Sequence, residues 1–405
     1  MTGLTIHPRR ALHELISKGG GGRWPPTATF QDSWPLSLKP YHRVFLAIAQ
    51  LVSVSSASLD DGENRALIDQ SRGSLMAALR DNVDSEAVRR TLDAGSDALG
   101  VSGWLGFFAC IAYLRHAYRW GISPIVREAQ HETGLSFPPQ LNTPWAALQH
   151  VFGFISPGGN LTSNIYCAFN ARRDLEYSFT VGMSTVHRET ERWNATLFLE
   201  MECKAAPMYD LMVVSIEAIE IGSATATLQA LKSVNGHLKE IFKYFFDNLT
   251  DSNVSQELWM AYVQGPHGWA LDGIDGVSGG QSLVIRTVDA FLGIRPFPTP
   301  EIESLHIPRE QRTWLNALRA YDIRTAAKTM NDTSVEMELE TMVKHLRVWR
   351  MGHMKRMVSY EGVPRPERQN MTAGKSLVAI EVAPDESAMV EHLRQQLALR
   401  LAQTK

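Results

Sequence analysis

The strongest constraint on this chain is a helical pattern of apolar residues over 334–360. Apolar side chains recur there in steps of three and four, which places them on one face of a long helix. That face carries Leu339, Met342, Val343, Leu346, Trp349 and Met357. Arg350 and His353 fall on the same face, so this helix is expected to turn two polar side chains toward the interior.

The histidine on this apolar face has two interpretations. In the first, His353 is a core residue whose ring nitrogens bond to neighbouring backbone groups. In the second, it is an axial ligand of haem iron, which needs a neutral imidazole, apolar surroundings and cations for the haem propionates. Arg350 precedes His353 by one turn and is a candidate for such a cation. No second histidine follows His353 four residues later, so a zinc site on this helix is not expected.

Composition excludes several kinds of partner. The net charge is −3, and the basic residues are scattered, so the chain has no electrostatic footprint for nucleic acid or anionic lipid. No apolar run reaches the roughly 18 residues of a membrane span, and the first residues lack a signal-type apolar segment. Three widely spaced cysteines, Cys110, Cys167 and Cys203, argue against a disulfide framework and a cysteine zinc site. We expect a cytoplasmic monomer without nucleic-acid or membrane partners.

Helical patterns dominate most of the chain, and 44% of its residues are hydrophobic, enough for a large core. Residues 156–192 differ, because they alternate in polarity around a Gly/Pro-rich turn, which predicts strands or an irregular hairpin. The helical stretch that follows is predicted to break near Pro207. We therefore predict a mainly α fold, with a smaller, mixed but mostly helical N-terminal domain over 1–187 and a large all-helical domain over 188–405.

A glycine-rich segment, Ser-Gly-Gly-Gln-Ser at 278–282, precedes an apolar helix that contains Asp289. It lacks the spacing of a Walker or dinucleotide motif, and no strand precedes it. It is either a tight turn that starts the helix or a loop in which small residues let the backbone approach a flat ligand closely. A carboxylate in an apolar helix needs a cation, so Asp289 either pairs with Arg350 or finds another partner.

These segments together resemble the indoleamine 2,3-dioxygenase family. The resemblance rests on Val-Ser-Gly-Gly-Gln-Ser and its Asp-containing helix over 277–294, followed by Arg-Met-Gly-His at 350–353. Weaker support comes from residues 34–45, 135–141 and 307–312. The resemblance implies a large helical domain that holds haem b and assigns these site residues: His353 as the proximal iron ligand, Asp289 and Arg350 as a buried ion pair beside it, and Ser278, Gly279 and Gly280 as the loop lining the distal pocket.

The resemblance also implies the chemistry. Members of the family bind O₂ on ferrous haem and insert both atoms across the 2,3-bond of an indole, and a reductant must first reduce the ferric haem. Because the electron-rich ring of the substrate attacks, no side chain is expected to act as an acid or base. The site must supply an imidazole, an apolar pocket and a clamp for the substrate.

The clamp is where this sequence departs from the family pattern. The family holds the substrate carboxylate with an arginine, whose place here is taken by Met260, and residues 250–264 contain no Arg or Lys. Losing such a charge-assisted hydrogen bond costs on the order of 1.5–3 kcal/mol of binding. We therefore expect a substrate without a free α-carboxylate, or one that is held differently. A decorated tryptophan, tryptamine or another indole of secondary metabolism fits this expectation.

Other expected pocket positions come from looser correspondences. The mobile glycine-threonine loop of the family corresponds to 371–376, where Thr372 and Gly374 are retained and Lys375 is new. Lys375 is either a replacement cation or a solvated loop residue. Asn194 and Phe198 fall at the remaining distal positions.

Three functions are compatible with these residues. The first is a haem-dependent dioxygenase acting on tryptophan or a tryptophan-derived indole. The second is a haem enzyme that performs another oxidation, such as hydroxylation or rearrangement. The third is a haem-binding protein without catalysis, and only turnover separates it from the first two.

Overall fold

The computed structural model describes residues 6–405, except 55–57, 59, 124–125, 127–128, 130–131, 133, 268–270, 272–273, 275, 361–370, 373–374 and 377–385. The α-helices are α1 (Pro8–Glu14), α2 (Lys39–Val54), α3 (Asp61–Asn82), α4 (Ser85–Asp93), α5 (Gly100–Trp120), α7 (Pro139–Phe152), α8 (Leu161–Asn164), α9 (Thr185–Glu220), α10 (Ala224–Asn248), α11 (Gln256–Leu258), α12 (Gly265–His267), α13 (Leu283–Phe291), α14 (Pro300–His306), α15 (Arg309–Tyr321), α16 (Ile323–Thr329), α17 (Thr333–Tyr360) and α18 (Glu386–Ala402). Short 3₁₀ or π segments are η1 (Leu15–Gly19), η2 (Gln31–Ser33), η3 (Gly95–Ala98), η4 (Tyr166–Ala168), η5 (Trp259–Gln264) and η6 (Gly279–Gln281), and two short strands pair as β1 (Met371–Thr372) and β2 (Lys375–Ser376).

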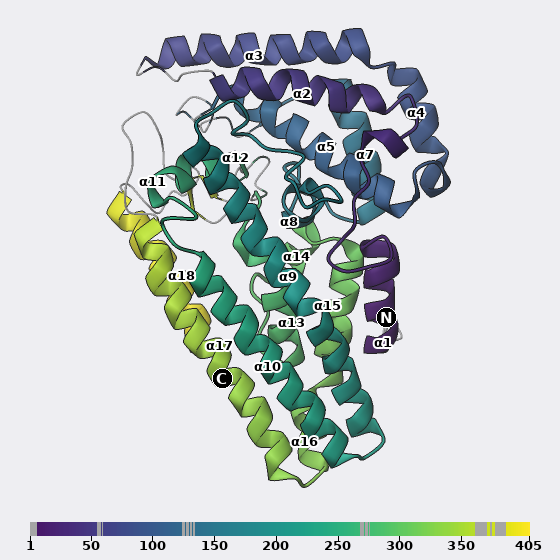
Figure 1. Ribbon diagram of the computed structural model, residues 1–405, viewed down its shortest axis with the longest axis vertical. Coiled ribbons are helices and arrows are strands. Elements are labelled where there is room, and N and C mark those ends of the chain that lie inside the picture. Colours follow the sequence, from purple (N-terminus) through teal and green to yellow (C-terminus); the bar gives the residue numbers. More distant parts are fainter. Residues whose placement is uncertain are drawn as a thin grey trace.

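Four helices, α9, α10, α17 and α18, lie side by side in one part of the molecule (Figure 1). α9 and α10 pack against each other, α10 packs against α17, and α17 packs against α18. The helices α2, α3, α5 and α7 gather at the other end, whereas α1 lies beside α15. The mainly α fold predicted from the sequence is confirmed.

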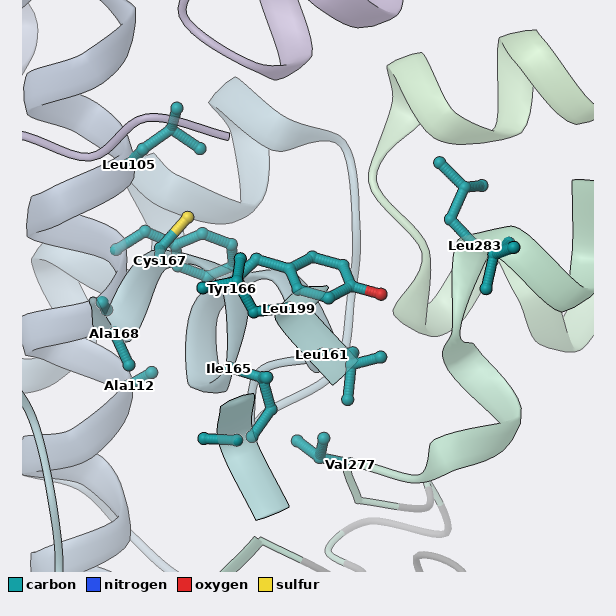
Figure 2. Packing of buried hydrophobic residues seen from close by; sticks show 14 of the residues in the cluster. Leu105, Ala112, Leu161, Ile165, Tyr166, Cys167, Ala168, Leu199, Val277 and Leu283 are labelled. Carbon is teal, nitrogen blue, oxygen red and sulfur yellow. The ribbon is translucent and has the colours of Figure 1, made fainter. Parts of the chain in front are cut away.

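The core is continuous around α5, in which residues 103–120 are all buried. A helix that is apolar on every side is expected at the centre of a large core. Figure 2 shows how the short α8–η4 segment fits between α5 and the start of α13, with Ile165 and Tyr166 between Ala112 and Leu283. The hydroxyl of Tyr166 points toward Leu283, so this segment supports the beginning of α13.

Of the two alternatives predicted over 156–192, strands are absent, and a hairpin is limited to the short loop that one antiparallel bridge closes. The structure has α8, η4 and the start of α9 there, with a single isolated bridge between Phe169 and Leu175. Side chains, rather than a neighbouring strand, form hydrogen bonds with the backbone of this segment. Glu191 accepts from the backbone N–H groups of Phe179 and Thr180 at 2.8 and 2.9 Å, and Asn160 forms a capping box with α8.

The helix break predicted near Pro207 is also wrong, since α9 runs from Thr185 to Glu220 with Pro207 inside it. Proline removes one backbone donor, but tertiary packing supplies more stability than one hydrogen bond. Ala205, Met208 and Tyr209 on either side are fully buried, which holds both halves in line. The predicted domain boundary at 187 falls in the first turn of α9, and the division into two domains stays a prediction.

Candidate functional site

His353 lies in α17, where aromatic rings surround it. Its ring stacks on Trp349, with centroids 4.9 Å apart and planes at 13°, and lies 5.7 Å from the ring of Phe245. No residue that the structure describes forms a hydrogen bond with either ring nitrogen. The interpretation as a core histidine bonded to a backbone group therefore finds no support among the described residues.

The protonation state of His353 suits a metal ligand. Burial by the surrounding protein, together with the nearby Arg350 guanidinium, lowers its pKa to about 4. The ring is therefore neutral near pH 7, which is the form that binds metals. Its side chain is nevertheless only half-buried, so the neighbours enclose the ring without packing over all of it.

The predicted ion pair between Asp289 and Arg350 is present. Arg350 Nη2 donates to both carboxylate oxygens of Asp289, at 2.7 and 2.8 Å, which joins α17 to α13. A second guanidinium, from Arg400 of α18, also donates to Asp289. The sequence analysis missed Arg400, because a helical pattern does not show which carboxylate a distant arginine will meet.

This buried cluster carries an excess of positive charge. Asp289, Arg350 and Arg400 are all less than a tenth exposed, at 5%, 5% and 8%. No second carboxylate of the described part of the chain pairs with either guanidinium. Two guanidiniums and one carboxylate leave a surplus of one positive charge, and a buried surplus favours an anionic partner such as a propionate.

The glycine-rich loop packs against α9. Ser278 Oγ accepts from the backbone N–H of Gly280 at 3.1 Å, and Gly279 and Gly280 are exposed. A methyl group on Gly279 would lie 3.2 Å from the ring of Phe198, tighter than most such contacts. The structure therefore brings the loop and Phe198 together, and glycine permits their close approach, while their role as two parts of one pocket stays a prediction.

A buried ion-pair network holds the backbone of this loop. Arg286 Nε donates to the carbonyl oxygen of Gly280 at 2.8 Å, and its Nη1 donates to Glu303 at 2.5 Å. Arg319 of α15 donates to both oxygens of Glu303, at 2.7 and 2.8 Å. Arg286 and Glu303 were not predicted. Like Arg350, Arg286 is a charged residue within an apolar helix, and this pattern could have identified it as buried. Nothing in the sequence identified its partner.

Asn194 faces the segment that replaces the family's clamp. Its Oδ1 accepts from Trp259 Nε1 at 3.0 Å, which fixes the amide beside η5. The side chain of Met260, the next residue, lies outside the described part of the chain, as do the side chains of Thr372 and Lys375 and the whole of Gly374. For these four positions the pocket assignment stays a prediction.

No group of three or more His, Cys, Asp or Glu side chains in the described ranges is arranged to hold a metal ion. A metal site built from protein ligands alone is therefore not formed by these residues. A single histidine suffices for haem, because the porphyrin nitrogens supply the equatorial ligands. The residues around His353 fit that requirement: a neutral imidazole, aromatic neighbours and a cationic cluster one turn away.

Two buried histidines away from this cluster make stability depend on pH. Burial lowers the pKa of His116 to about 4, and the carbonyl oxygens of Pro266 and Gly158 offset only part of that effect. Burial, with the nearby Arg286 guanidinium, also lowers the pKa of His306 to about 4. Both rings stay neutral in the folded chain at a pH that already protonates them in the unfolded chain.

We expect the free energy of unfolding to fall by several kcal/mol between about pH 6.5 and about pH 4, because the unfolded chain binds more protons across that range. Urea unfolding at a series of pH values measures this slope. The variant His306→Gln should flatten the profile relative to wild type. Equal stability of the wild-type chain at about pH 7 and about pH 5 would contradict the expectation.

The family comparison agrees with this geometry. The family model described as "Indoleamine 2,3-dioxygenase" matches residues 104–396, a range that contains Asp289, Arg350 and His353. A search of curated proteins found no match. None of the described helices is both long and apolar enough to cross a membrane. The chain belongs to the indoleamine 2,3-dioxygenase family.

Proposed function

We propose that this protein is a haem-dependent oxygenase that holds haem b through His353 and acts on tryptophan or a tryptophan-derived indole. The observation that carries the proposal is the state of His353: a neutral imidazole without a hydrogen-bond partner in the described structure, one turn from the buried pair of Arg350 and Asp289. Dioxygenation of the indole 2,3-bond is the chemistry of the family to which the chain belongs.

The residues divide into two sets around the proposed haem site. On one side, His353 would hold the iron, and the surplus positive charge of Arg350 and Arg400 would favour a propionate. On the other side, the Ser278–Gly280 backbone and Phe198 would line the pocket. When bound, haem supplies the binding and activation of O₂ at its iron.

The chain itself supplies positioning rather than acid–base catalysis. Asn194 is a polar side chain beside the clamp segment, and its carbonyl oxygen already accepts a hydrogen bond from Trp259. The aromatic rings of Trp349 and Phe245 keep the imidazole desolvated and therefore neutral. The work of the site is then to orient an electron-rich substrate and to exclude water.

Within this class of indoles, we favour a substrate that lacks a free α-carboxylate. Residues 250–264 contain no Arg or Lys, although the family places its clamp arginine at the position of Met260. An indole with an amide, ester or amine side chain needs no such cation. Lys375 is a second source of positive charge, and if it acts as the clamp the substrate retains its carboxylate.

Introducing the missing cation should change the preference for substrate. We expect Met260→Arg to lower KM for L-tryptophan about tenfold, because a guanidinium–carboxylate hydrogen bond contributes on the order of 1.5–3 kcal/mol. Met260→Gln, similar in length and uncharged, is the control and should leave KM unchanged. Steady-state kinetics with L-tryptophan and tryptamine measure KM for each substrate in the wild type and in both variants. Efficient wild-type turnover of free L-tryptophan would contradict the substrate proposal.

The proposed function is tested by anaerobic reduction of the haem-loaded protein, followed by O₂ in the presence of a panel of indoles. Mass spectrometry of the products then separates the candidate functions. A gain of two oxygen atoms supports dioxygenation, and a gain of one indicates hydroxylation or a related oxidation. Haem binding without any product from the panel would contradict the enzymatic proposal and favour a non-catalytic haem protein.

A further inference from the structure

The end of α18 closes a ring of hydrogen bonds around the ion pair of α13 and α17. Arg350 Nη1 donates to Thr404 Oγ, which donates in turn to the carbonyl oxygen of Arg400 at 2.9 Å. Arg400 donates to Asp289, and Asp289 accepts from Arg350. One hydroxyl can both accept and donate, so Thr404 satisfies the ring without an unpaired group. We call Arg400 and Thr404 the α18 clasp.

The clasp is buried, in contrast to Glu391 and Arg394 of the same helix. Thr404 has no exposed surface and Arg400 is 8% exposed. Arg394, on the same helix, pairs with Glu391 at 3.8 Å, with side chains 66% and 55% exposed. An exposed pair contributes little to stability, whereas breaking a buried one leaves an uncompensated charge. The contacts of the clasp are therefore expected to contribute to stability, unlike the exposed pair on the same helix.

Further bonds tie the clasp to both neighbouring helices. Arg400 Nη1 donates at 2.7 Å to the carbonyl oxygen of Arg295, just beyond α13. Arg347 of α17 donates at 2.7 Å to the carbonyl oxygen of Thr404. Arg350 is thereby held from two sides, by Asp289 and by Thr404, and His353 follows it by one helical turn. The clasp restrains the turn of α17 that carries the imidazole.

We propose that Arg400 and Thr404 are positioning residues of the proximal side, which fix Arg350 and Asp289 and thereby control haem retention and the reduction potential of the iron. This inference rests on the proposed function. Both residues lie beyond the 104–396 range matched by the family model, so the match assigns them no role. Arg400 also supplies the surplus positive charge, which favours the ferrous state because reduction adds a negative charge nearby.

The test compares haem-loaded variants that differ by one group. Thr404→Val removes the hydroxyl at nearly constant volume, Thr404→Ser restores it, and Arg400→Gln removes the charge. Arg394→Gln is the matched control on the exposed face of the same helix. We expect Thr404→Val and Arg400→Gln to transfer haem to apomyoglobin about tenfold faster or more, a range typical of outer-shell partners. Thr404→Ser and Arg394→Gln should behave as wild type.

The midpoint potential separates positioning from general destabilisation. Arg400→Gln should lower it, and Thr404→Val should shift it with recovery in Thr404→Ser. If Arg400→Gln fails to fold by circular dichroism, the Thr404→Val and Thr404→Ser pair carries the test. If Thr404→Val keeps the haem retention and the midpoint potential of the wild type, the role proposed for the clasp is wrong, while the proposed function stays intact. A wild-type chain that takes up no haem would overturn both.

Discussion

Replacing His353 with alanine is expected to abolish stable haem binding. The imidazole is neutral, has no hydrogen-bond partner among the described residues, and lies one turn beyond Arg350, which pairs with Asp289. Without it, the proposed iron site loses its protein ligand, and the remaining apolar contacts hold haem weakly. Haem content per chain, measured from the Soret band after hemin loading and desalting, should fall from about one to near zero.

A matched control is available on the same helix. His345 of α17 lies two turns earlier and contacts the side-chain oxygen of Asn235 at 3.2 Å, so His345→Ala should retain the Soret band. Free imidazole added to His353→Gly should restore part of the band by occupying the vacated space. Full haem content in His353→Ala would show that another residue holds the iron.

The second large effect is expected from Glu303→Ala. Glu303 is 2% exposed and is the carboxylate partner of Arg286 and Arg319. Removing one partner from a buried ion pair leaves an uncompensated charge, which costs about 3–5 kcal/mol. Arg286 also holds the carbonyl oxygen of Gly280, so the same change should loosen the glycine-rich loop. Urea unfolding of the haem-free chain measures the loss of stability.

The control for this substitution is Glu301→Ala, in the same helix. Glu301 is exposed, so its removal should leave the free energy of unfolding close to that of the wild-type chain. Hydrogen exchange of the Gly279 and Gly280 amides should rise in Glu303→Ala and stay unchanged in Glu301→Ala. A loss below about 1 kcal/mol for Glu303→Ala would mean that Arg286 and Arg319 find other partners or water.

The helices and part of the site were predictable because their signals are local. Apolar residues at helical spacing identify the buried face of α17. Asp289 and Arg350 each stand on an apolar helix, and a buried charge requires an opposite charge, so burial made each a candidate partner for the other, and the family resemblance implied the pair. The same reasoning applies to any charged residue on an apolar helical face, including Arg286.

The rest depended on contacts that the sequence does not encode locally. Alternating polarity over 156–192 suggested strands or an irregular hairpin, but Glu191, near the start of α9, accepts from the backbone N–H groups of Phe179 and Thr180. Pro207 was expected to break a helix that packing on both sides keeps continuous. Arg400 is found through its bond to Asp289, 111 residues away in the sequence. Choosing among many possible partners for a long side chain requires the packed structure.

Titration of the wild-type protein with hemin tests the central claim most directly. If His353 holds haem, one equivalent should bind per chain and produce a Soret band that survives desalting. Carbon monoxide added to the reduced, haem-loaded protein should then shift the band. A wild-type chain that emerges colourless from the desalting column would contradict the haem assignment and the functions derived from it.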